Sequence, residues 1–148
     1  MAPDAEKTGE HTAAKRIAEV LPDAGIYASM TVGTSMYPML RQQRDTVVIV
    51  PVDGRAKKYD VVLFRRGDQN VLHRVIRVLP DGYLIRGDNC DAEESVSEEQ
   101  ILGVLAAFVR NGKHRKSTDL SCRIYAHLIV WLHPLFRAAV RTVRKLRK

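Results

Sequence analysis

The sequence predicts a mainly β domain, an antiparallel sandwich or partly closed barrel, followed by an amphipathic C-terminal helix. Short apolar runs rich in β-branched residues follow one another between residues 26 and 109. Gly, Pro, Asn and Asp separate these runs, and no helical pattern lies between them, which is typical of antiparallel β folds. From about residue 120 the apolar side chains instead recur every three or four positions, as in a helix. A length of 148 residues fits one domain with short extensions.

Residues 1–25 are predicted to form an N-terminal arm. Its first eleven residues are polar. Apolar side chains at three- and four-residue spacing between positions 13 and 21 predict a short amphipathic helix, which Pro22 and Gly25 end. No stretch in residues 1–28 resembles a signal peptide or a membrane span.

Residues 26–112 are predicted to form the β domain. The expected strands cover residues 26–32, 46–52, 61–64, 71–79, 83–86 and 101–109. Asp81-Gly82, between two apolar runs, is a strong hairpin signal.

Residues 113–148 are predicted to form a basic linker and one amphipathic helix. The linker covers residues 113–118, and the helix begins near Leu120 and is kinked by Pro134. Residues 101–148 hold 11 Lys/Arg and a single acidic residue, Asp119, whereas residues 1–100 hold 13 Lys/Arg and 16 Asp/Glu. The basic character therefore belongs to the tail and indicates an anionic partner surface.

This tail has two interpretations. It is an interfacial helix on an anionic membrane surface, which predicts a peripheral membrane protein on a side that the sequence does not define. Alternatively, it is a helix docked on the β domain with a solvated basic edge. Nucleic-acid binding is not expected, because there is no known motif and few interleaved aromatic residues.

Metal and cofactor chemistry has no sequence signal. Cys90 and Cys122 are too few for a disulfide framework, and no metal-ligand spacing occurs, so neither metal nor cofactor is expected.

The most unusual segment is GTSMYPML, residues 33–40. Gly33 allows a close backbone approach, and Pro38 fixes the exit from the turn. Ser35 then stands at the end of a strand beside apolar Met36. A serine hydroxyl becomes a competent nucleophile only when a base takes its proton.

This segment resembles the serine box of the signal peptidase I family, which shares its fold with the LexA-type self-cleaving repressors. The resemblance continues in order through RDTVVI (44–49), YDVVLF (59–64), VLHRVI (71–76) and RGDN (86–89). It covers roughly residues 28–109, and several boxes in register are a specific signal.

The resemblance implies a catalytic set. Most bacterial members use a lysine base directly before an arginine, but here His73 precedes Arg74, as in the endoplasmic-reticulum, archaeal and spore-former branch. Histidine titrates near neutral pH and gains from a carboxylate that fixes its tautomer. The family's candidate for that carboxylate is Asp88. The backbone N–H of Ser35 is the implied oxyanion donor, and Gly33 stands where some relatives supply a hydroxyl.

The resemblance also implies how a peptide or preprotein binds. Family members hold the substrate as an extended strand, here between residues 29–33 and 69–72. The implied contact residues are Met30, Val32, Gly33, Met36, Asn70 and Leu72. The expected reaction is cleavage of leader or signal peptides after small residues, through an acyl-enzyme.

Other interpretations of the same residues stay open. The alternative function is a LexA-like module that cleaves itself or binds a partner, although no N-terminal helix-turn-helix of sufficient length is present and the base is histidine. An inactive membrane-surface adaptor is a third. Taken alone, Ser35 and Asp88 are ordinary turn residues, and His73 is an ordinary core histidine.

Overall fold

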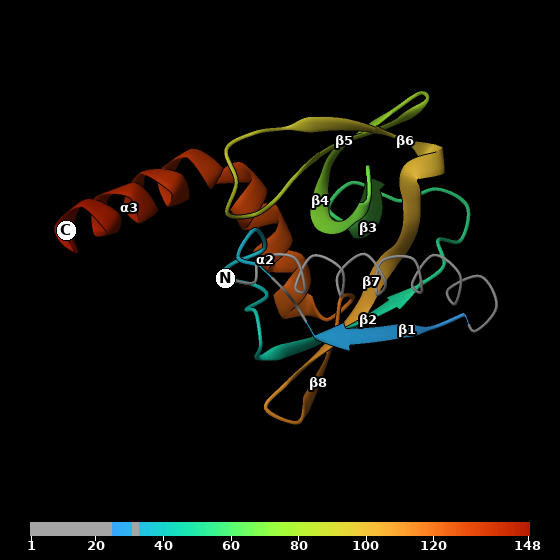
Figure 1. The fold of residues 1–148 in the computed structure, drawn as a ribbon, viewed down its shortest axis with the longest axis horizontal. Coiled ribbons are helices and arrows are strands. Elements are labelled where there is room, and N and C mark those ends of the chain that lie inside the picture. Colours follow the sequence, from blue (N-terminus) through green and yellow to red (C-terminus); the bar gives the residue numbers. More distant parts are fainter. Residues whose placement is uncertain (1–24, 31–32) are drawn as a thin grey trace, which may run out of the picture.

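The computed structural model describes residues 25–30 and 33–148, which form one curled antiparallel sheet and two C-terminal helices (Figure 1). The strands are β1 (Tyr27–Met30), β2 (Asp45–Val50), β3 (Val61–Arg66), β4 (Gln69–Leu79), β5 (Gly82–Arg86), β6 (Glu94–Ser97), β7 (Ile101–Arg110) and β8 (Lys113–Lys116). A short 3₁₀ turn, η1 (Glu98–Gln100), precedes β7, and the helices are α2 (Leu120–Trp131) and α3 (His133–Leu146).

The sheet has the strand order β1-β2-β7-β3-β4-β5-β6, with β8 beside β7, and all its pairs are antiparallel. Register shifts interrupt three of the ladders, at 48/49, 63/64 and 75/77. Such bulges increase local twist and bend a strand. They accompany the curling of this sheet into a half-barrel.

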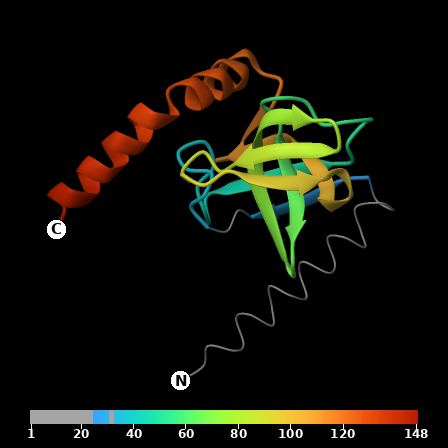
Figure 2. The same ribbon diagram turned by 90° about the horizontal axis from the view of Figure 1, so that it is seen from above.

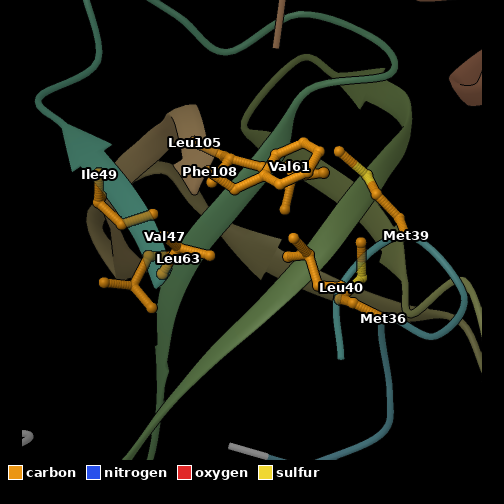
Figure 3. Packing of buried hydrophobic residues seen from close by; sticks show 9 residues of the cluster. All are labelled: Met36, Met39, Leu40, Val47, Ile49, Val61, Leu63, Leu105 and Phe108. Atoms are coloured by element: carbon orange, nitrogen blue, oxygen red, sulfur yellow. The ribbon is translucent and has the colours of Figure 1, made fainter. Parts of the chain in front are cut away.

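Strand β3 is buried on both faces, and its side chains alternate between two cores. Val61 and Leu63 belong to a first cluster with Met36 and Phe108 among others, shown in Figure 3. Val62 and Phe64 belong to a second cluster around Tyr83. A strand with apolar neighbours on both sides reads as a continuous hydrophobic run, which explains the sequence VVLF.

The mainly β prediction is confirmed, and each of the six expected strands is present. Residues 31–32, the end of the first expected strand, lie outside the described residues, as does the helix expected in the N-terminal arm. Strand β6 was not expected. The hairpin at Asp81-Gly82 is present, but its two-residue turn is Pro80-Asp81, and Gly82 already pairs with Leu79.

The C-terminal segment corrects two expectations. Residues 113–118 are not a linker, because β8 pairs with β7 across the Asn111-Gly112 turn and extends the β body to Lys116. The single kinked helix is two helices that meet at Leu132, and Pro134 lies in the first turn of α3. Proline is tolerated there, since first-turn N–H groups have no intrahelical acceptor.

The two helices relate differently to the sheet. Cys122 and Tyr125 of α2 pack on the first core cluster, whereas α3 runs out from the β body toward the C-terminus (Figure 2). Within the described residues, neither helix has the length and apolar character that crossing a bilayer requires.

Candidate active site

Ser35 lies in a turn that buried side chains anchor. Met36, Met39 and Leu40 directly after it are all buried in the first core cluster. The backbone closes on itself through the N–H of Tyr37 on the carbonyl of Thr34, at 3.1 Å. Ser35 itself stays partly exposed. The sequence thus fixes the turn by burying its apolar half and leaves the hydroxyl-bearing residue at the surface.

His73 comes from the middle of β4, opposite Val62 of β3. It is only 5% exposed, and its ring lies 5.8 Å from that of Phe64, centroid to centroid. Burial lowers the pKa of His73, and Arg66 acts in the same direction, while Glu94 partly opposes them. The imidazole is therefore neutral at neutral pH, which is the form that accepts a proton.

Gly87 is where the serine turn and the histidine converge. A methyl group built on its Cα would lie 2.7 Å from the carbonyl oxygen of Ser35 and 3.0 Å from Nε2 of His73. These two atoms are therefore no farther apart than the sum of those distances. The backbone of the serine turn and the side chain of His73 therefore approach the same point of the molecule from different elements.

Glu94, at the start of β6, is the carboxylate that faces the far side of the imidazole. Its Oε1 lies 3.3 Å from Nδ1 of His73, and the same carboxylate pairs with Arg66. Within the described part of the chain, the buried Nδ1 therefore has a charged neighbour but no partner that meets hydrogen-bond geometry. Glu94 therefore acts on His73 as a nearby charge. Sequence reasoning missed it.

Asp88 has a different set of partners from the one expected. Its two oxygens accept from Nε and Nη2 of Arg74, both at 2.8 Å, and the hydroxyl of Tyr125 donates to it at 3.0 Å. Arg74 is 3% exposed and also donates to the carbonyl of Tyr59. Asp88 thus forms a buried ion pair with Arg74, the residue that follows His73. The charge of Asp88 has only a minor influence on the pKa of His73.

The loop of residues 87–91 holds the serine turn in place. The backbone N–H of Asn89 donates to the carbonyl of Ser35 at 2.8 Å, and its side-chain amide donates to that of Thr34 at 3.1 Å. On its other side, Arg137 of α3 donates to the carbonyl and the side-chain oxygen of Asn89, at 2.7 and 2.6 Å. Gly87, Asn89 and Arg137 therefore position the serine turn. In the sequence, only the GDN motif pointed to Gly87 and Asn89, and no spacing pointed to Arg137.

The residues expected to bind substrate come from the serine turn, from strand β4 and from the end of β1 and the residues after it. Gly33 has a φ of +83°, and its N–H donates to the side chain of Gln42. Met36 is buried beneath the turn, and Asn70 and Leu72 lie on β4 opposite Arg65 and Leu63. Met30 ends β1, paired with Thr46, whereas Val32 lies outside the described residues.

The residues named so far do not form a metal site. Across residues 25–30 and 33–148, no cluster of three or more His, Cys, Asp or Glu side chains could hold a metal ion. The groups that these elements bring together are the serine turn, an imidazole and two guanidinium–carboxylate pairs.

Comparison with known proteins adds nothing to this geometry. No protein-family model matches the chain, and no curated protein matches it.

Proposed function

We propose that this protein is a serine endopeptidase of the signal-peptidase kind, with Ser35 as nucleophile and His73 as its base. The observation that carries the proposal is the convergence of the Ser35 carbonyl and the His73 Nε2 on Gly87. The order of sequence boxes around these residues, described above, supports it independently.

The environment of His73 suits a general base. A buried imidazole is neutral at neutral pH, and its Nε2 is directed toward the serine turn. A carboxylate beside Nδ1 favours the tautomer that carries its proton there, which leaves Nε2 free to accept. We assign that role to Glu94 in place of Asp88, because Oε1 of Glu94 lies 3.3 Å from Nδ1 of His73. The oxygens of Asp88 instead accept from Arg74 and Tyr125.

The reaction follows from these roles. His73 removes the proton of Ser35 as the oxygen attacks a peptide carbonyl, and the imidazolium that forms lies near the negative charge of Glu94. The imidazolium then protonates the leaving amine. A water activated by the same imidazole hydrolyses the acyl-enzyme, and the backbone N–H of Ser35 is the proposed oxyanion donor.

Arg74 and Asp88 have a structural role in this mechanism. Their ion pair fixes β4 directly after His73 and fixes the loop directly after Gly87. It therefore sets the distance between base and nucleophile without touching the substrate.

The substrate in this proposal is an extended peptide with small residues before the cut, such as a leader with an Ala-x-Ala site. The sheet register places residues 69–72 of β4 against β3 and begins the pairing with β5 at Arg74. The support for strand-like substrate binding is the resemblance described above.

The test is to label the protein with a fluorophosphonate probe and locate the adduct by peptide mapping. We expect the adduct on Ser35, and we expect Ser35→Ala to abolish both labelling and cleavage of an Ala-x-Ala leader. Ser121→Ala is the matched control, because Ser121 is an exposed serine on α2. An adduct elsewhere, or turnover that persists in Ser35→Ala, would refute the proposal.

The same samples decide between processing and self-cleavage. We expect the mass of the purified wild-type chain to stay that of the intact protein. Two stable fragments that are absent in Ser35→Ala would instead identify the LexA-like alternative.

A further inference from the structure

Helix α3 has its polar and apolar faces reversed relative to a helix that packs on its own domain. Arg137 and Arg141 both pair with Asp91 of the active-site loop, so the basic face is the one that touches the β body. Leu135, Val143 and Leu146 are 69%, 50% and 81% exposed. Amphipathic helices of globular proteins normally bury the apolar face and expose the charged one.

The preceding helix presents a second exposed apolar row. On α2, Leu120, Ile124, Leu128 and Trp131 recur at helical spacing and are all exposed, although the opposite face of α2 already packs on the core. Of the eleven exposed large apolar side chains among the described residues, eight lie between Leu120 and Leu146. A concentration of this kind marks an interaction surface.

The charge of residues 120–148 indicates which kind of partner binds to this surface. Residues 120–148 hold seven Lys/Arg and no Asp or Glu, and Arg144, Lys145, Arg147 and Lys148 cluster at the end. A second copy laid along α3 would therefore bring like charges together. Nucleic acid would leave the exposed leucines in water. An anionic lipid surface accommodates both the apolar and the basic side chains. The leucines lie among the acyl chains, and the basic side chains reach up to the head groups.

We propose that α2 and α3 bind an anionic membrane surface through this outer apolar face, which consists of Leu120, Ile124, Leu128 and Trp131 of α2 and Leu135, Val143 and Leu146 of α3. Trp131 lies where the two helices meet, and tryptophan favours the membrane–water interface. The segment lies in the interface without crossing it.

This arrangement sets the distance of the active-site loop from the lipid. The basic face of α3 contacts Asn89 and Asp91. The exposed Leu135 and Leu146 lie on the other side of the same helix. A helix with its side chains is about 10 Å wide. The loop that holds Ser35 would therefore stand roughly one helix diameter above the lipid. The membrane proposal does not depend on the proposed peptidase activity.

The first experiment uses Trp131, the single tryptophan of the chain, as the reporter. The full-length protein is titrated with phosphatidylcholine vesicles and with equimolar phosphatidylcholine–phosphatidylglycerol vesicles. We expect a blue shift of the emission and quenching by brominated acyl chains only with the anionic vesicles, and weaker binding as salt rises. No binding to anionic vesicles, or equal binding to both kinds, would overturn the proposal.

The second experiment removes the apolar contribution. Leu135→Ser, Val143→Ser and Leu146→Ser are combined, with Ile26→Ser and Val78→Ser as the control, because those two side chains are exposed on the β body. Burial of each leucine is worth about tenfold in affinity. We expect the outer-face variant to lose at least about 100-fold in vesicle partitioning and the control to bind like the wild type. Unchanged binding of the outer-face variant contradicts the proposal.

The third experiment neutralises basic side chains at the end of α3. It keeps the test valid if the outer-face variant, with its three serine substitutions, misfolds. We expect Arg144→Gln with Lys145→Gln to weaken binding by about fivefold for each residue. Lys113→Gln with Lys116→Gln, on exposed β8, should leave it unchanged. Sedimentation velocity without lipid supplies the remaining outcome. A dimer that the outer-face variant dissociates, together with no vesicle binding, would assign the face to a second copy of the chain.

Discussion

At the scale of single residues, His73 is surrounded by two guanidinium–carboxylate pairs that differ in what they do. Arg66 and Glu94 form the first pair, on its Nδ1 side. In the second pair, Arg74 directly follows His73 in the chain, and Asp88 directly follows Gly87. Of the two pairs, the first has the larger influence on the pKa of His73. The pKa of His73 is lowered mainly by burial, and Glu94 opposes that shift.

Glu94→Gln therefore has a signed effect on pH dependence. In the wild type, the acidic limb of the rate of fluorophosphonate labelling should lie below 6.5, the ordinary histidine pKa, because burial favours the neutral ring. Removing Glu94 removes an influence that raises the pKa and leaves Arg66, which lowers it. We expect the limb to move to still lower pH, and the plateau rate to fall because the tautomer is less well fixed.

The matched variant is Glu93→Gln, which neutralises the neighbouring exposed carboxylate that pairs with Arg86 instead. Its pH profile should follow that of the wild type. A limb that moves upward in Glu94→Gln would exclude Glu94 as the partner of His73.

At the scale of elements, the 87–91 loop is held between the serine turn, strand β4 and helix α3. Gly87 contacts the first two, and Asn89 joins the turn to α3. The loop has no room for a side chain at Gly87, because the contacts there include a backbone carbonyl that cannot rotate away.

Gly87→Ala is therefore expected to separate the proposed nucleophile, Ser35, from the proposed base, His73. The added methyl would lie 2.7 Å from the backbone carbonyl oxygen of Ser35, so the serine turn has to shift. A displacement approaching 1 Å in an active site lowers rates by about 100-fold. Labelling and leader cleavage measure the loss. Gly112→Ala is the control, since its φ of +74° strains the backbone at the β7–β8 turn, far along the chain from the site. Equal activity losses in both variants would mean that destabilisation alone explains the effect.

At the scale of the whole molecule, the Arg74–Asp88 pair connects several elements of the fold. Arg74 on β4 reaches the carbonyl of Tyr59 before β3, and Asp88 accepts from Tyr125 on α2. The pair lies almost entirely out of water. Removal of one partner leaves a buried charge uncompensated, which is far costlier than the loss of a surface ion pair.

Asp88→Asn should accordingly lower the free energy of unfolding by about 3–5 kcal/mol. Urea denaturation followed by far-UV circular dichroism measures this. Asp91→Asn, which removes an exposed carboxylate paired with Arg137 and Arg141, should have a much smaller effect. Equal stability of Asp88→Asn and the wild type would contradict the structural role given to this pair.

The sequence by itself determined the β character and the approximate strands. It could do so because alternation, turn residues and helical spacing are local, and because each strand must bury its apolar side chains. The linker prediction for residues 113–118 was wrong because a short, exposed hairpin strand such as β8 has no apolar pattern to reveal it.

Only the tertiary structure decided which side chains meet. Asp88 and Glu94 are six residues apart in the chain, yet the sheet gives the first to Arg74 and the second to His73. The amphipathic pattern of α3 was evident, but which face turns to the protein was not, because hydrophobic periodicity does not encode where Asp91 lies. Long-range pairing has no local signal, so partners, burial and the outward direction of a helix face follow from the packed molecule alone.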